Sequence, residues 1–336
     1  MDIAEDVLFL AQSAGASCYH RTMLPATTLG CDWGGLDSPP PQMVLGRGEV
    51  RFDQGEPDLG GYRIVVLQTP AQEGWIDVIP KLQAGGTKVV FDADYHMHEI
   101  ATDREVLDLI EALLGMCDGV ICATRYIAER YARLNPRTFV CENGIDLRPY
   151  ALSKPPHDTV NIGWAGTSVV LEELLPWLAQ IAGMMRVRDV TNFISIGQRA
   201  GDVVASMGAV APERCLAIPG MLPEQVPAAM SIFDIAFDPA GQSPWRLGRS
   251  QLRWLEASAW GIPLVGDPRV YPNMEDGVTG FHASDPIDVA RSILRLVDDP
   301  LLRAAVGGRA RRVVEDRYTM QAVAPQWIHA LEQVAA

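Results

Sequence analysis

The stretch that decides the fold runs from Leu147 to Trp164 and reads LRPYALSKPPHDTVNIGW. Its first thirteen residues hold three prolines and no apolar run, which is the composition of a linker. A strand-like run, Val160–Trp164, follows at once. The pattern that precedes the linker therefore starts again after it, which predicts two domains joined near residue 150.

On both sides of the linker, short apolar runs alternate with helix-like stretches. The runs show no strict apolar–polar alternation, so both faces of each predicted strand are expected to be buried. This is typical of a parallel sheet covered by helices on both faces. The predicted strands are 7–11, 63–68, 87–92, 119–124 and 138–141 before the linker, and 160–164, 192–196, 214–218, 234–237 and 262–265 after it.

The predicted helices lie between these strands, at 103–116, 125–134, 171–185, 223–232 and 249–260, with three more in 286–335 broken near 299–300 and 318–319. Residues 31–60 are rich in Gly, Pro and Asp, and are expected to be mostly loop. We predict an α/β fold of two doubly wound parallel-sheet domains, 1–150 and 151–318, facing across a cleft. For the terminal helix, 319–336, packing back on the first domain is one option. In such sheets ligands bind beyond the carboxyl ends of the strands.

Composition narrows the possible partners. The chain has 336 residues, of which 48% are hydrophobic and 21% charged, so it is expected to fold. Its formal charge of −14 argues against a nucleic-acid backbone as the main ligand. Residues 1–150 carry a net charge of −10 and residues 151–336 one of −4, so an anion site is expected in the second half.

The expected location is cytoplasmic. No segment approaches the ~20 consecutive apolar residues of a membrane helix. The start, Met1–Asp6, is acidic where a secretory signal has a basic region. The six cysteines lack zinc-site spacing, so we expect them to be reduced.

The most informative segment for function is 244–280. We expect a helix from about Ser250, with Ser250 as its N-cap, following Gly248. Free N–H groups at that helix start, flanked by three arginines at 246, 249 and 253, would form a phosphate site. Glu256, among apolar neighbours, could accept two hydrogen bonds from the diol of a ribose. The alternative is a solvated network of Arg249, Arg253 and Glu256.

Two loops of the first half also carry candidate chemistry. Asp92, Asp94, His96 and His98 follow a predicted strand, and could bind a metal or act in acid–base catalysis. A plain polar loop is the alternative. The loop after the first strand holds Ser17, Tyr19 and Arg21, of which Arg21 could touch phosphate or acceptor, or cap the surface.

Two stretches carry a family pattern. Glu256–Val265, EASAWGIPLV, and Asp276–Gly280, DGVTG, resemble the second glutamate, the strand and the turn of retaining family-4 glycosyltransferases of the GT-B fold. Weaker matches extend over much of the chain, at Asp118–Thr124, Asn143–Asp146, Ile162–Thr167 and Asp298–Thr319. The family's first glutamate falls at position 248, where this chain has glycine. Arg249–Ser250 instead resembles a subgroup whose loop reads Lys/Arg-Ser-x-x-Lys/Arg-x-x-Glu.

The resemblance implies two Rossmann-like domains and the transfer of a sugar from a UDP- or GDP-sugar to an acceptor hydroxyl. It further implies retention, no covalent protein nucleophile, and no obligatory metal or other cofactor. Two alternatives stay open: a nucleotide-sugar epimerase on the same fold, and a non-catalytic module that binds nucleotide sugars.

The resemblance also assigns roles to residues. Catalytic roles fall to Asp94, His96 and Arg249. Acceptor or cleft contacts fall to Ser17, Tyr19, Arg21 and Asp92. Donor contacts fall to Gly166, Thr167, Met221, Leu222, Arg246, Gly248, Arg249, Ser250, Gln251 and Glu256.

The acceptor stays open among protein, glycan, lipid and modified base, as does the oligomeric state. No stable binding to nucleic acid is expected. Short chains of this kind also occur in bacteriophages, in which case the location would be the host cytoplasm.

Overall fold

The computed structural model describes residues 3–11, 15–35, 59, 61–101, 103–166, 171–239 and 243–336. The chain folds into two compact units. The first comprises Met1–Ile145, Gly248–Ser250 and Met320–Ala336, and the second Asp146–Leu247 and Gln251–Thr319. The first passage between the units follows Ile145, slightly before the predicted boundary at 150.

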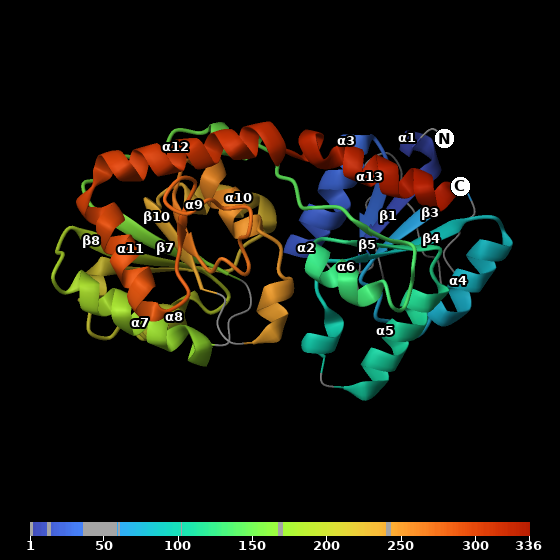
Figure 1. Ribbon diagram of the computed structural model, residues 1–336, viewed down its shortest axis with the longest axis horizontal. Coiled ribbons are helices and arrows are strands. Elements are labelled where there is room, and N and C mark those ends of the chain that lie inside the picture. Colours follow the sequence, from blue (N-terminus) through green and yellow to red (C-terminus); the bar gives the residue numbers. More distant parts are fainter. Residues whose placement is uncertain are drawn as a thin grey trace. The chain divides into compact units, whose positions relative to one another are not determined.

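The first unit contains a six-stranded parallel sheet in the order β2-β1-β3-β4-β5-β6 (Figure 1). The buried strands confirm the expectation from apolar runs, because β1, β3 and β5 are buried along their whole length. The strands are β1 (Val7–Ala11), β2 (Asp32–Gly35), β3 (Ile64–Gln68), β4 (Lys88–Ala93), β5 (Gly119–Cys122) and β6 (Thr138–Val140).

Strand β2 corrects the sequence analysis, which placed a loop from residue 31 onward. Its sequence, DWGG, has no apolar run and no strong strand propensity. It is extended because it pairs with β1, with Leu8 opposite Asp32 and Ala11 opposite Gly35. A neighbouring strand, rather than local preference, therefore decides this element.

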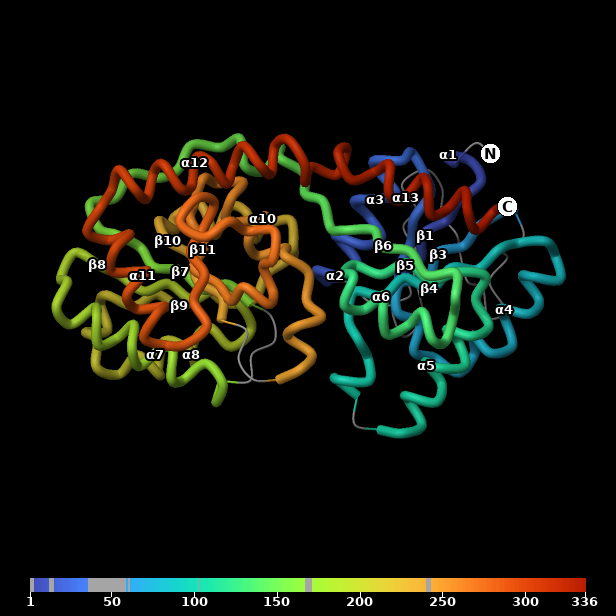
Figure 2. The backbone as a smooth tube through the Cα atoms, viewed as in Figure 1, coloured from blue at the N-terminus to red at the C-terminus, as the bar shows by residue number. Residues whose placement is uncertain are grey.

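Helices cover both faces of the first sheet. Leu8 and Leu10 of β1 point into a core shared with α4, α5 and α6, and Val7 and Phe9 into one shared with α3 and α13. In Figures 1 and 2, α13 runs beside α3 within this unit. The helices are α1 (Ile3–Asp6), α2 (Ala16–Cys18), α3 (Leu24–Leu29), α4 (Trp75–Ala84), α5 (Arg104–Met116), α6 (Arg125–Tyr131) and α13 (Met320–Ala335), with a π-helix, η1 (Tyr19–Met23), and a 3-10 turn, η2 (Met97–Glu99).

The second unit also contains a six-stranded parallel sheet, but in a different strand order, β12-β11-β10-β7-β8-β9: two strands lie on one side of its first strand, β7, whereas only β2 lies on one side of β1. From β7, the chain adds β8 and β9 on one side and then β10, β11 and β12 on the other, as in a doubly wound fold. The strands are β7 (Val160–Ala165), β8 (Thr191–Gly197), β9 (Cys215–Pro219), β10 (Ile235–Asp238), β11 (Leu264–Gly266) and β12 (Phe281–His282).

Helices also flank both faces of the second sheet. One core joins Phe193 and Phe237 of the sheet to Trp177 of α7, Val203 of α8 and Ile293 of α11. Figure 1 places α9, α10 and α12 on the opposite side of the sheet. The helices are α7 (Leu171–Met185), α8 (Ala200–Ala205), α9 (Val226–Met230), α10 (Leu252–Ala259), α11 (Pro286–Asp298) and α12 (Pro300–Arg317), with 3-10 turns η3 (Arg148–Ala151), η4 (Pro212–Arg214), η5 (Pro223–Gln225) and η6 (Pro244–Gly248).

The expected fold class, two Rossmann-like α/β domains, is confirmed. The tail also breaks where expected, and the side chain of Asp299 caps α12 by accepting a hydrogen bond from the N–H of Leu302. The loop expected after β1 is instead largely helical over residues 16–29. The helix expected over 249–260 begins later, at Leu252.

Two further features bear on the expected location. No helix in the parts of the chain that the structure describes is long and apolar enough to cross a membrane. All six cysteines lie among the described residues, and none of them forms a disulfide there.

Candidate functional site

The carboxyl edge of the first sheet carries two buried carboxylates. Asp92 lies in β4 and is fully buried, and Asp94 follows that strand with an exposed fraction of 8%. In a doubly wound sheet this edge is where ligands bind. Asp94 therefore follows the strand, as predicted, whereas Asp92 lies within it, and the contacts predicted for both residues stay predictions.

Asp92 forms a bidentate ion pair with Arg21. Nη2 of Arg21 lies 2.5 Å from Oδ1 of Asp92, and its Nε lies 3.2 Å from Oδ2. Nη1 of Arg21 donates to the carbonyl of Cys141 at 2.6 Å and to Oδ1 of Asn143 at 2.9 Å. Burial raises the pKa of Asp92 to about 6, against the opposing charge of Arg21.

This pairing corrects the expected role of Arg21. The sequence offered it as a phosphate or acceptor contact, or as a surface cap, but its side chain is only 1% exposed. Its guanidinium also lies 4.5 Å from the centre of the Trp327 ring. We therefore assign Arg21 to holding the first unit together, with Asp92 as its partner.

Asp94 is bound differently. Its Oδ2 accepts a hydrogen bond from the hydroxyl of Ser17, and its Oδ1 lies 3.4 Å from Oγ1 of Thr69. Burial raises the pKa of Asp94, and the bond from Ser17 opposes that rise. The carboxyl group thus holds a proton more readily than an exposed aspartate does.

Thr69 is a site residue that the sequence analysis missed. It follows β3 with a φ of +42°, a conformation that costs energy for a β-branched residue. Its N–H donates to the carbonyl of Asp92 at 2.8 Å, which holds it there. The sequence signal that could have identified Thr69 was the Thr69-Pro70 pair directly after a predicted strand. That pair does not reveal the positive φ of Thr69.

Tyr19 belongs to the π-helix η1, which begins directly after Cys18. Its ring packs edge-on against that of His20, with centroids 4.9 Å apart. Short π-helical turns are frequent at functional sites, and this one positions Arg21 towards β4.

His96 and His98 form a second polar group beyond β4. Their rings stack at 5.2 Å. His96 Nδ1 lies 3.3 Å from Oε1 of Glu99, and His98 Nε2 lies 2.8 Å from Oε1 of Glu111. Burial lowers the pKa of His96, with Glu99 opposing. Across the described residues, no three His, Cys, Asp or Glu side chains are grouped to hold a metal ion.

The segment Gly248–Ser250 belongs to the first unit. Thr124 Oγ1 donates to the carbonyl of Gly248 at 3.2 Å, and Asn143 Nδ2 donates to Oγ of Ser250 at 2.8 Å. A Cβ at position 248 would lie 3.3 Å from Cδ1 of Tyr126, so a larger residue there would press on that ring. The close packing gives a physical reason for the glycine at this position.

Ser250 is not the N-cap of α10, contrary to expectation. Gln251 occupies that position and makes no side-chain cap bond. The hydroxyl oxygen of Ser250 instead accepts a hydrogen bond from Asn143. Arg249, which directly precedes Ser250, is partly exposed.

Glu256 lies inside α10 and is 4% exposed. Nη1 of Arg253 lies 2.6 Å from its Oε2. Two of the three residues of the alternative network, Arg253 and Glu256, therefore pair, with the side chain of Glu256 5% exposed and that of Arg253 15% exposed. The N–H of the Trp254 ring donates to the carbonyl of Thr279 at 3.0 Å, which ties α10 to the turn that follows β11.

Arg246, one of the arginines expected at the phosphate site, is buried beside a carboxylate. It is 3% exposed, and its Nε lies 2.8 Å from Oε2 of Glu173. Its Nη1 donates to the carbonyl of Pro239 at 3.2 Å, and Ser243 donates to the other oxygen of Glu173. A phosphate that bound Arg246 would compete with Glu173 for the positive charge of its guanidinium.

The remaining donor residues follow β7 and β9. Gly166 follows β7, and its carbonyl would lie 1.8 Å from a Cβ at Gly197, whose φ is +140°. The two backbones can approach this closely only because position 197 is glycine. Thr167 lies outside the described residues. Met221 is partly exposed, and Leu222 is 63% exposed.

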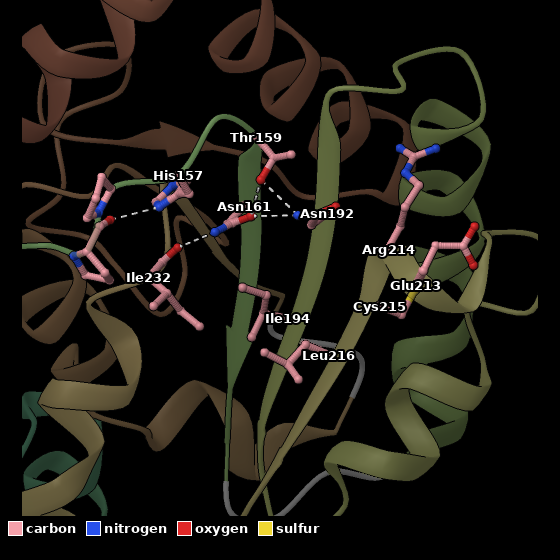
Figure 3. A pocket seen from close by; sticks show the side chains of 12 residues that line it. His157, Thr159, Asn161, Asn192, Ile194, Glu213, Arg214, Cys215, Leu216 and Ile232 are labelled. Carbon is pink, nitrogen blue, oxygen red and sulfur yellow. Dashed lines mark hydrogen bonds between the residues drawn. The ribbon is translucent and has the colours of Figure 1, made fainter.

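A pocket of about 400 Å³ opens in the second unit, but at the other end of the sheet (Figure 3). Its lining residues include Thr159, Asn161 and Asn192, at the amino ends of β7 and β8, and Arg214 beside β9. Thr159, Asn161 and Asn192 hydrogen-bond to one another, as the dashed lines in Figure 3 show. The predicted donor residues Gly166, Met221 and Leu222 instead follow the carboxyl ends of β7 and β9, the end of such a sheet at which ligands bind.

Comparison with known proteins bears on both units. Residues 209–329 match a family described as glycosyl transferase-like. This region contains η6, α10 and the candidate donor residues from Met221 to Glu256. No sequence among the curated proteins matches the chain.

Several solved structures share the fold. HepE of Anabaena, in complex with UDP-glucose, has a TM-score of 0.71 at 16% identity, over 98% of this chain and 99% of that one. A glycosyltransferase of Rickettsia africae has a TM-score of 0.70 at 11% identity, over 98% of each chain. TarM of S. aureus, in a complex that includes UDP, has a TM-score of 0.61 at 16% identity, over 80% of this chain. The chain spans 55% of the length of that TarM structure. The two units therefore have the fold of the GT-B glycosyltransferases.

Proposed function

We propose that the chain is a glycosyltransferase that moves a sugar from a UDP-sugar to the hydroxyl group of an acceptor. The observation that carries the proposal is Glu256, a buried carboxylate on α10 inside the region that matches the glycosyl transferase-like family. The UDP-glucose bound by HepE, which shares the fold, supports a uridine donor.

Each donor residue has a role in this proposal. Glu256 accepts hydrogen bonds from the ribose hydroxyls, and its bond to Arg253 orients the carboxylate for them. Arg249 and the N–H groups of Ser250 and Gln251 hold the diphosphate. A fixed cation and backbone donors can stabilise the charge that develops on a leaving diphosphate, which is the role a metal ion plays in other enzymes.

The transfer itself needs no protein nucleophile. The acceptor oxygen bonds to the anomeric carbon while the bond from that carbon to the phosphate oxygen breaks, and UDP leaves with the electron pair. The hydroxyl proton passes to the leaving diphosphate and then to solvent. The resemblance to family-4 enzymes supports retention at the anomeric carbon, which NMR of the product anomer tests directly.

Asp94 and His96 are the proposed contacts of the first unit to the acceptor or the donor sugar. Asp94 suits hydrogen bonding to a sugar hydroxyl, because burial raises its pKa and Ser17 fixes its orientation. His96 suits a neutral contact, since burial lowers its pKa. We do not favour the epimerase, because Asp92, one of the carboxylates that it would use, is paired with Arg21.

The test is titration calorimetry with UDP-glucose, UDP-N-acetylglucosamine and GDP-mannose, together with an assay for slow release of nucleotide. Glu256→Gln keeps an oxygen for Arg253, and Glu256→Ala removes it. We expect Glu256→Ala to weaken UDP-sugar binding about 10-fold or more, because a hydrogen bond to a charged group contributes about 1.5–3 kcal/mol.

The matched control is Glu315→Gln, an exposed glutamate on α12 that pairs with Arg311. It should bind like the natural protein. Unchanged binding in Glu256→Ala would remove the site assignment. Conversion of the donor to an epimer would favour the epimerase, and binding without any turnover would favour a non-catalytic module.

A further inference from the structure

A chain of hydrogen bonds ends at Ser250, and from Arg21 onward each group donates to the next. It begins at Asp92, passes through the guanidinium of Arg21 to Oδ1 of Asn143, and continues from Nδ2 of Asn143 to Oγ of Ser250. All four residues belong to the first unit. Asp92, Arg21 and Asn143 are 0%, 1% and 6% exposed, so water does not replace these bonds.

The direction follows from which groups can donate. A guanidinium has donors only, so the atom of Asn143 that faces it must be the carbonyl oxygen. The amide nitrogen of Asn143 then faces Ser250, and it can only donate. Oγ of Ser250 is therefore the acceptor in that bond. This fixes which end of the Asn143 amide faces each neighbour, an assignment that geometry alone leaves open.

As a consequence, the hydroxyl hydrogen of Ser250 takes no part in the bond with Asn143. It does not point to Asn143, and no acceptor for it is seen among the residues that the structure describes. Ser250 is partly exposed and follows Arg249, the cation assigned above to the diphosphate. A ligand in this place meets a hydroxyl that donates, and a phosphate oxygen accepts only.

The geometry points to Ser250 as a hydrogen-bond donor to the diphosphate of the nucleotide sugar, with Asn143 as the positioning residue that sets the hydroxyl in its donating state. This inference rests on the proposed function. It adds a side-chain contact to the backbone contact proposed for Ser250, and it gives the buried Arg21–Asp92 pair an influence on ligand binding. It also explains why Asn143 is an amide, because a carboxylate there would accept from Ser250.

The test compares binding of UDP and uridine by calorimetry in the full chain. In Asn143→Asp, the new carboxylate still pairs with Arg21 but draws the Ser250 hydrogen to itself. We expect Asn143→Asp and Ser250→Ala each to weaken UDP binding about 10-fold, as for one hydrogen bond to a charged group. Uridine binding should stay unchanged in both, because uridine carries no phosphate.

Two further variants separate this role from a structural one. Ser250→Thr keeps a hydroxyl and should bind UDP within about two-fold of the natural protein, since hydrogen bonding is preserved. In the Ser250→Ala background, Asn143→Asp should cause no further loss, because its effect passes through that hydroxyl. The exposed Ser153→Ala serves as the matched control.

The outcomes distinguish the two proposals. If the natural chain binds neither UDP nor a UDP-sugar, the proposed function fails, and this inference fails with it. If it binds UDP and Ser250→Ala binds equally well, only the Ser250 contact is overturned. If Ser250→Ala loses affinity while Asn143→Asp does not, the positioning by Asn143 is overturned. Equal losses of UDP and uridine would indicate a merely structural role.

Discussion

The two units each bury an arginine–carboxylate pair near the candidate residues, and the pairs differ in how they are held. In the first unit, Arg21 and Asp92 are 1% and 0% exposed, and the pair is bidentate with two further bonds from Arg21. In the second unit, the side chains of Arg253 and Glu256 are 15% and 5% exposed, and Nη1 of Arg253 lies 2.6 Å from Oε2 of Glu256.

We infer from this difference that the first pair mainly stabilises the fold, and that the second belongs to the proposed donor site. Both oxygens of Asp92 contact the guanidinium of Arg21, and the pair joins segments far apart in the chain. The Arg253–Glu256 pair is local, with its members three positions apart on one helix. Such a pair can orient a carboxylate for a ligand without holding a fold together. The predictions below test this contrast.

The largest effect is expected for Arg21→Met. It leaves Asp92 buried without its partner, which typically costs about 3–5 kcal/mol of the free energy of unfolding. Urea denaturation gives the size of the loss, and hydrogen exchange should place it in β4 and α13. Arg291→Met, which breaks an exposed pair with Asp288, is the matched control and should change little. A loss below about 1 kcal/mol would contradict the scaffold role.

A smaller loss is expected for Arg253→Met. The pair is local and keeps some contact with water, so we expect a loss of about 1–3 kcal/mol in the free energy of unfolding. UDP-sugar affinity should fall as well, because Glu256 loses its orientation. Arg311→Met, which breaks the exposed pair of Arg311 with Glu315 on α12, controls for the loss of one arginine. A loss equal to that of Arg21→Met, with intact nucleotide binding, would reverse the comparison.

The pH dependence sharpens the contrast within the first unit. Burial raises the pKa of Asp94 above its ordinary value of 3.8, so the folded state binds its proton more tightly than the unfolded state. Its contribution to stability is therefore complete below that value and is lost as the pH rises through the raised pKa. The Asp94→Asn variant has no carboxyl group at this position, so it carries no charge there at any pH.

We therefore expect the variant to gain stability relative to the natural chain as the pH rises from about 4 towards neutrality. Urea denaturation at several pH values measures this difference. The charge of Asp94 also raises the pKa of Asp92, so Asp94→Asn should lower the pKa of Asp92 and add to the gain in the same direction. A difference that is independent of pH would show that Asp94 ionises as freely as an exposed aspartate.

The smallest effect is expected at Gly248. In Gly248→Ala the new Cβ lies 3.3 Å from Cδ1 of Tyr126, so the ring must shift slightly, at a cost of about 1 kcal/mol or less. Gly248→Glu, which restores the residue of the resembling family, should cost more because the whole side chain must pass the ring. Equal stability of these two variants would show that close packing does not explain the glycine.

The sequence by itself determined the main elements of both sheets. The apolar runs at 7–11, 64–68 and 160–164 lie in β1, β3 and β7, because burial on both faces requires continuous apolar residues. The helix break near 299–300 was also determined by local sequence, because Asp299 as N-cap and Pro300 as the first helical residue start α12. Glu256 was found from its motif, and the structure places it in a helix as expected.

Only the tertiary structure decided the roles of the polar residues. The partners of Arg21 lie 71, 120 and 122 positions away, and that of Ser250 lies 107 positions away. Strand β2 likewise exists through its pairing with β1. Local sequence specifies backbone conformation and which faces are apolar. The partner of a buried charge or amide depends on which strands come side by side, and that is settled only when the sheet forms.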